Sequence, residues 1–262
     1  SYLALQEYSE AISCFDQVIL RDEDCAGAWL KKGSALLSIG QFEPAVDALT
    51  RSLDLRPEDP NGWYDRAVAL AELRRFDDAV SSYDRAIAIN SRFTNAWFDK
   101  GIALTRLGRD GEAIPAFDST LAIDPKFINA FYEKGLALER LSDDEDALSA
   151  FESALSIDPE FMQGLFHKGL VLFRMKQYEE SLTTFDKILK TAPENADALR
   201  EKARALSRLD RPLDALASLN KSLELVDNRA EDWIFRGTLQ NEVEKYREAL
   251  DAFDRALALE PD

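Results

Sequence analysis

One position recurs every 34 residues along the chain and carries a large apolar side chain each time. A small residue follows four positions later in every copy. Because the spacing never slips, the chain must be an array of one repeated structural unit. The two series are Trp29, Trp63, Trp97, Phe131, Leu165, Leu199 and Trp233, and Gly33, Ala67, Gly101, Gly135, Gly169, Ala203 and Gly237.

Each period contains two stretches in which apolar residues recur at steps of three and four, as amphipathic helices require. In the second stretch a small residue is again followed four positions later by a large one, as in Ala113 and Phe117. A proline, such as Pro125, often closes this stretch, because proline cannot continue a helix. Acids at Asp110 and Asp144 replace an aromatic residue that other copies carry at the start of the second stretch. The pattern predicts an all-α protein of paired antiparallel helices.

Segments such as "AWLKKGSALLSIGQFEPAVDALTRSLDLRP" and "AWFDKGIALTRLG" resemble the tetratricopeptide repeat. The resemblance implies a right-handed superhelical solenoid in which residues 26–262 form seven 34-residue units in one continuous array. Residues 1–25 would be a partial repeat, with a second helix starting at about Ser9. It also implies that the first helices line a concave groove that binds a peptide or a partner segment. The seven expected repeat starts are Ala26, Pro60, Thr94, Ile128, Met162, Ala196 and Ala230.

The composition excludes several other classes of function. A formal net charge of −17 disfavours nucleic acid and anionic membrane surfaces, because both carry negative charge. Two cysteines and one histidine, His167, are too few for a His/Cys metal site, and nothing near His167 suggests a catalytic triad. We therefore expect a protein-interaction scaffold that is not an enzyme, has no cofactor and no metal, and resides in the cytoplasm.

An aromatic residue follows the Trp position directly in four successive repeats. By the geometry of the family this position points toward the groove. The rings have two interpretations: a platform for a bound partner, or packing between neighbouring helices. The candidate partner-binding residues are Tyr64, Phe98, Tyr132 and Phe166.

Three positions before these rings lies a row of amide side chains, Asn61, Asn95 and Asn129. Amides can donate to and accept from a peptide backbone, which makes the row a candidate for partner binding. The alternative is helix capping, since asparagine is favoured at helix starts.

Arginines occupy two groove positions in repeat 6 that other repeats fill largely with aromatic or aliphatic residues. With Arg174 of repeat 5, they suggest a site for an acidic partner near repeats 5–6, because arginine forms forked hydrogen bonds to carboxylates. The alternative is local pairing with acids such as Asp197 and Glu201. The candidate residues are Arg174, Arg200, Arg204 and Arg208.

A basic residue also recurs in every full repeat, for example Lys32 and Lys100, and an acid recurs on the second helices, for example Asp16 and Asp84. We interpret this pattern as a ladder of ion pairs between helices. Leu250 and Leu257 of the last repeat should be partly exposed, since terminal repeats normally need a polar cap. This suggests a fragment of a longer protein, and an alternative role in end-to-end self-association or spacing, with any enzymatic domain elsewhere.

Overall fold

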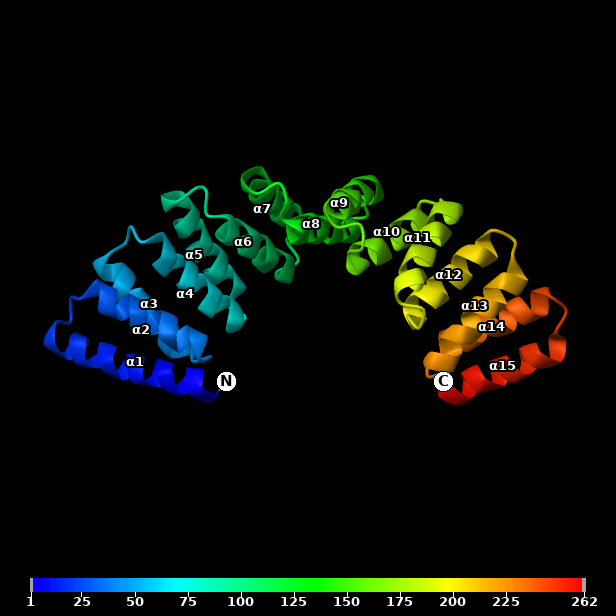
Figure 1. Ribbon diagram of the computed structural model, residues 1–262, viewed down its shortest axis with the longest axis horizontal. Helices are drawn as coiled ribbons and strands as arrows, with labels where there is room; N and C mark the ends of the chain where they lie inside the picture. The colour runs from blue at the N-terminus through cyan, green and yellow to red at the C-terminus, as the bar shows by residue number, and fades with distance from the viewer. Residues whose placement is uncertain (1, 261–262) are drawn as a thin grey trace. The chain divides into compact units, whose positions relative to one another are not determined.

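The computed structural model describes residues 2–260, with side chains from residue 7 onward, and these residues form helices joined by short turns. The chain divides into two compact units, Ser1–Leu141 and Ser142–Asp262 (Figure 1). The first unit contains α1 (Tyr2–Arg21), α2 (Ala26–Ser38), α3 (Phe42–Leu55), α4 (Pro60–Glu72), α5 (Phe76–Ile89), α6 (Thr94–Arg106), α7 (Asp110–Ile123) and α8 (Ile128–Arg140). The second contains α9 (Asp144–Ile157), α10 (Met162–Arg174), α11 (Tyr178–Thr191), α12 (Ala196–Arg208), α13 (Pro212–Leu225), α14 (Ala230–Glu242) and α15 (Tyr246–Leu259).

The predicted fold class is confirmed, because the 15 helices of the described residues are arranged as antiparallel pairs and no strand occurs among them. The even-numbered helices from α2 to α14 begin at the seven residues that the sequence pattern marks as repeat starts. Within each unit, a first helix packs on its own second helix and on the second helix of the preceding repeat. That residues 26–262 form one continuous solenoid stays a prediction.

The small residues of the period allow the two helices of a pair to approach closely. A Cβ atom built on Gly101 would lie 2.5 Å from the ring of Phe117, and one on Gly169 would lie 2.7 Å from the ring of Phe185. Both rings are fully buried. Glycine therefore leaves room for the phenylalanine ring opposite in these two repeats, whereas Ala67 and Ala203 occupy the same position in others.

The Trp position joins each repeat to the loop before it. The indole N–H of Trp63 donates to the backbone carbonyl of Pro57 at 2.8 Å, and that of Trp97 donates to the carbonyl of Ser91 at 3.0 Å. Trp29 and Trp233 make the corresponding bonds six residues upstream. The Trp rings are only half-buried. They therefore contribute to the apolar core on one side and bind the preceding loop through their N–H groups on the other.

The first helix of the chain differs from the expected partial repeat. α1 runs without a break from Tyr2 to Arg21, whereas the sequence pattern predicted a second helix that starts at about Ser9. The segment "LALQE" contains good helix formers and no glycine or proline, so its local preference continues the helix across the expected turn.

The turns between the two helices of a repeat use one residue in the left-handed region. Only two of these residues are glycines, although glycine adopts this conformation without steric cost. The residue after it usually donates its N–H to a carbonyl five positions earlier, as Gln177 does to Leu172, which closes the first helix. The left-handed residues are Gly40, Arg74, Gly108, Ser142, Lys176, Asp210 and Glu244.

Candidate functional site

The aromatic rings of the row on the first helices are half-buried, and three of them pack against another ring of their own repeat. The ring of Tyr64 lies 4.8 Å from that of Phe93, and the ring of Phe98 lies 4.9 Å from that of Phe127. Phe93 and Phe127 are the residues directly before α6 and α8, and sequence reasoning missed them. In the second unit, Phe166 lies 5.9 Å from Phe185. These rings therefore take part in packing, and their role as a platform for a bound partner stays a prediction.

The fourth ring of the row, Tyr132 on α8, is also half-buried. Burial raises the pKa of its hydroxyl, and the carboxylates of Glu133 and Glu139 raise that pKa further. His167 on α10 comes directly after the aromatic position of its repeat, and its ring lies 5.7 Å from that of Phe151 and 6.0 Å from that of Phe166. These contacts make His167 a packed side chain of the first helix.

A cavity of about 430 Å³ opens between α4, α5 and α6, beside the ring of Tyr64. The hydroxyl of Tyr64 donates to Oδ2 of Asp99 at 2.7 Å, and both residues line the cavity. Burial raises the pKa of the Asp99 carboxyl, an effect that the Tyr64 hydroxyl partly offsets. The remaining lining residues are Val68, Ala71, Glu72, Arg74, Phe76, Tyr83, Ile102, Ala103 and Arg106.

Asp65 occupies the same position one repeat earlier and is held in a similar way. The hydroxyl of Ser34 donates to its Oδ2 atom at 2.5 Å. Burial raises the pKa of the Asp65 carboxyl, against the lowering effect of Ser34. Two successive first helices thus carry half-buried carboxylates that accept a hydrogen bond from a hydroxyl group. The residues that donate lie 31 and 35 positions away in the sequence, so the local sequence around each carboxylate does not reveal its partner.

The amide row lies at the second residue of each first helix, where its side chains are exposed. Asp59 caps α4 and accepts the N–H of Asn61, while Phe93 precedes α6 and Phe127 precedes α8. The capping alternative is therefore wrong for Asn61, Asn95 and Asn129, because the cap position lies two residues before each of them.

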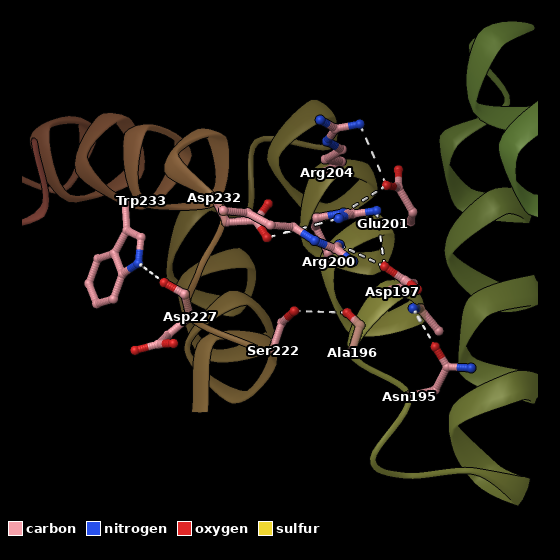
Figure 2. Close-up of polar contacts among 12 residues, drawn as sticks. Asn195, Ala196, Asp197, Arg200, Glu201, Arg204, Ser222, Asp227, Asp232 and Trp233 are labelled. Carbon is pink, nitrogen blue, oxygen red and sulfur yellow. Dashed lines mark hydrogen bonds and ion pairs between the residues drawn. The ribbon is translucent and has the colours of Figure 1, made fainter. Parts of the chain in front are cut away.

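Arg200 and Arg204 of α12 lie in a network of carboxylates on α12 and α14 (Figure 2). The guanidinium of Arg200 contacts Glu201 at 3.1 Å, Asp197 at 3.2 Å and Asp232 at 3.9 Å. Glu201 and Asp232 are buried, and burial raises the pKa of Asp232 against the opposing effect of the arginines. The network therefore neutralises much of its charge internally.

The remaining predicted arginines have different surroundings. Arg204 lies 3.5 Å from Glu201 and is 45% exposed, and Arg174 pairs with Asp144 at 2.7 Å. The exposed guanidinium of Arg208 lies 6.0 Å from the ring of Phe173. Sequence reasoning noted that Asp144 interrupts the aromatic position but missed its pairing with Arg174, 30 residues later.

Family models described as tetratricopeptide repeat match residues 1–60, 30–92, 64–126, 128–161 and 166–230. The chain belongs to the tetratricopeptide repeat family. No curated protein matches it.

Solved structures support the same fold. The C-terminal part of a tetratricopeptide repeat protein from Cytophaga hutchinsonii is 17% identical with a TM-score of 0.75, over 88% of this chain and 95% of that chain. MamA from Desulfovibrio magneticus is 20% identical with a TM-score of 0.62, over 64% of this chain and 95% of that chain. YrrB, described as having an unusual peptide-binding site, is 20% identical with a TM-score of 0.63, over 76% of this chain and 99% of that chain.

The ladder of ion pairs between successive tetratricopeptide repeats is confirmed where the acid is present. Each pair joins a first-helix lysine to an acid 16 residues earlier, at 2.6–2.7 Å. Arg66 instead donates to the hydroxyls of Thr50 and Ser82. The five pairs are Lys32–Asp16, Lys100–Asp84, Lys134–Asp118, Lys168–Glu152 and Lys202–Asp186.

The described part of the tetratricopeptide repeats contains no cluster of three or more potential metal ligands among His, Cys, Asp and Glu. Over the same residues, no helix combines the length and the apolar character needed to cross a bilayer.

Proposed function

We propose that this chain is a non-catalytic scaffold that binds a peptide or a partner segment along its first helices. The cavity beside Tyr64 is the observation that supports this function most directly, because it combines apolar walls with a few polar groups on those helices. Tetratricopeptide repeats generally mediate protein–protein interactions, and YrrB, which shares the fold, is described as having a peptide-binding site.

Within this proposal, Tyr64, Phe98, Tyr132 and Phe166 provide contact area through their exposed edges. Packing against other rings holds Tyr64, Phe98 and Phe166 in place before a partner arrives, which lowers the ordering cost of binding. Asn61, Asn95 and Asn129 are exposed, so their amides can bond to the backbone of an extended peptide.

The proposal also retains an acidic contact near repeats 5–6. Arg208 is exposed, and a carboxylate can approach it without displacing an ion pair. Arg174, Arg200 and Arg204 already contact carboxylates of the chain, so they would bind an acidic partner by sharing or exchanging these contacts. We therefore expect Arg208 to contribute the largest share of any acidic selectivity in the second unit.

The scaffold function is tested with a substitution in the cavity and a matched one elsewhere. Pools of nine-residue peptides with degenerate flanks are measured against the wild-type chain, Ile102→Lys and Ala88→Lys. Ile102 lines the cavity, whereas Ala88 is exposed on the second helix α5. We expect Ile102→Lys to lose peptide binding and Ala88→Lys to retain it, with both variants still helical by circular dichroism. Equal binding by the three proteins would contradict the proposal.

A second candidate function is self-association through α15. Leu250 and Leu257 are 64% and 61% exposed, whereas the equivalent residues of α13, Leu216 and Leu223, are buried. An apolar helix face of this kind favours contact with another copy. Light scattering across concentration tests it: we expect the wild-type chain to associate and Leu250→Glu/Leu257→Glu to stay monomeric. A wild-type mass that does not change with concentration argues against this candidate.

A further inference from the structure

Asp99 is a carboxylate with spare acceptor capacity at the edge of a cavity. The hydroxyl of Tyr64 donates to its Oδ2 atom, whereas an ionised carboxylate has about four acceptor sites. Asp99 is half-buried, and the two influences on its pKa are burial and the Tyr64 hydroxyl. A partly desolvated carboxylate is costly unless it is paired with a cation. The described side chains supply a neutral donor to Asp99, and a ligand can supply the cation.

The equivalent position in repeat 6 shows what full neutralisation looks like. Glu201 lies two residues after Leu199, as Asp99 lies two residues after Trp97. Glu201 contacts the guanidinium groups of both Arg200 and Arg204. Asp99 therefore stands where another repeat of this protein brings two cations to a carboxylate.

The walls of the cavity suit the stem of a long basic side chain. Val68 and Ile102 present aliphatic groups, and Tyr64 and Tyr83 present rings. Lysine and arginine bury their methylene groups along such surfaces while the charged end contacts a polar group. A cation can also interact with the face of an aromatic ring at the same time.

The charges at the cavity are distributed along its length. Arg106 lies seven residues after Asp99 on α6, which places their backbones about 10 Å apart along the helix axis. Glu72 and Arg74, at the end of α4, provide one further charge of each sign. The end of the cavity that holds Asp99 is thus separated from the end that holds Arg106. In addition, the net charge of −17 on the chain favours the approach of a basic ligand.

We propose that the cavity between α4, α5 and α6 receives a lysine or arginine side chain of a bound peptide, with its cationic group on Asp99. This inference rests on the proposed scaffold function and specifies the chemistry of its partner. Tyr64 then has two roles: its hydroxyl orients the carboxylate, and its ring forms one wall around the basic side chain.

The test uses four pools of nine-residue peptides with degenerate flanks and a central Lys, Arg, Gln or Glu. Binding is measured to the wild-type chain, to Asp99→Asn and to Asp47→Asn. The Asp99 variant keeps the size of the side chain and an acceptor for Tyr64. Asp47 is exposed on the second helix α3, so its variant changes the net charge equally away from the cavity.

We expect the wild-type chain to prefer the Lys or Arg pool over the Gln pool by about three- to tenfold, as for a partly buried ion pair. Asp99→Asn should remove this preference, and Asp47→Asn should retain it. Arg106→Ala should increase the preference, because it removes a cation from the cavity. Fluorescence of the unliganded variants, compared with the wild type, shows that each one is folded.

The outcomes separate this inference from the scaffold function. A wild-type chain that binds none of the four pools contradicts both. Binding without a basic preference, or a basic preference that survives in Asp99→Asn, overturns the inference alone. A preference for the Glu pool that Arg106→Ala abolishes also overturns it, and assigns the cavity to an acidic side chain instead.

Discussion

Asp99 in the first unit and Glu201 in the second occupy the same position of the repeat, yet the chain treats their charges differently. Asp99 accepts a hydrogen bond from the neutral hydroxyl of Tyr64 and lies beside a cavity. Glu201 is buried among arginines of its own helix. One fold position can therefore hold a carboxylate that is available to a ligand or one that is used for structure.

The cause of the difference lies in the residues one position earlier. That position holds Phe98 before Asp99 and Arg200 before Glu201, and the tyrosine that donates to Asp99, Tyr64, stands at the same position one repeat earlier. A tyrosine contributes a ring and one neutral donor, whereas an arginine contributes a charge and five donors. Where a guanidinium replaces the ring, the carboxylate is used in an internal network of ion pairs. The row of arginines in residues 198–212 therefore does not by itself identify a binding site.

The largest test of this comparison is Arg200→Met. Without the Arg200 guanidinium, Glu201 keeps only the contact with Arg204 at 3.5 Å, and Asp232 loses its contact at 3.9 Å. Both acids are buried, so water cannot readily replace the lost cation. Removing one partner of a buried ion pair typically costs about 3–5 kcal/mol. We therefore expect the free energy of unfolding, measured by urea denaturation, to fall by that order.

Arg208→Met is the matched control, because Arg208 is exposed and contacts a ring instead of a carboxylate. Its effect should stay within about 0.5 kcal/mol. Equal effects of the two substitutions would show that the network is not structural. The same result decides how binding data are interpreted, since loss of a partner in an Arg200 variant is informative only if the variant is still folded.

The second test compares Asp99→Asn with the wild-type chain as pH changes. The native pKa of Asp99 is raised, so the native state binds the proton more tightly than the unfolded state, whose pKa is about 3.9. Stability then falls as pH rises from about 4 through the native pKa. Asn carries no titrating charge and still accepts the Tyr64 hydrogen bond.

We therefore expect Asp99→Asn to become more stable relative to the wild-type chain as pH rises from 4 to 7. The change in the difference between their free energies of unfolding should be about 1 kcal/mol or less. Urea denaturation at several pH values measures it. The Asp47→Asn variant, at an exposed residue of α3, is measured alongside as the control for the same change in net charge. If the wild-type chain instead becomes more stable relative to Asp99→Asn as pH rises, the charge of the Asp99 carboxylate is already well neutralised within the protein.

The helices and the ladder could be predicted because they depend on spacing that is visible in the sequence. Pro60 and Thr94 start helices where the period places them, and Lys100 pairs with Asp84 as the recurrent charges indicate. These features repeat in nearly every copy. A pattern that recurs can be inferred even when each single copy is ambiguous.

The candidate site could be predicted only in part, because it depends on where the copies differ. The Tyr64–Asp99 bond and the Arg174–Asp144 pair each join one unusual residue to another about one repeat away. Neighbouring repeats lack one member of the Tyr64–Asp99 bond, so no periodic signal marks it, whereas the ion pair recurs one repeat earlier as Arg140–Asp110 at 2.7 Å. The asparagine row illustrates the opposite error: a residue type suited to capping lies two positions too late to cap.

The smallest test concerns the turns, where the two units also differ. Two of the left-handed residues in the first unit are Gly40 and Gly108, whereas the second unit uses Lys176 and other residues with side chains. A non-glycine residue in this conformation costs about 1–2 kcal/mol. The entropy that glycine adds to the unfolded chain offsets about 0.4–1 kcal/mol of this, so Lys176→Gly should stabilise the protein by about 0.5–1 kcal/mol. Gly108→Ala should destabilise it by about the same amount. Thermal and urea denaturation of both variants measure the two effects, and a stabilising Gly108→Ala would show that left-handed geometry does not limit stability at these turns.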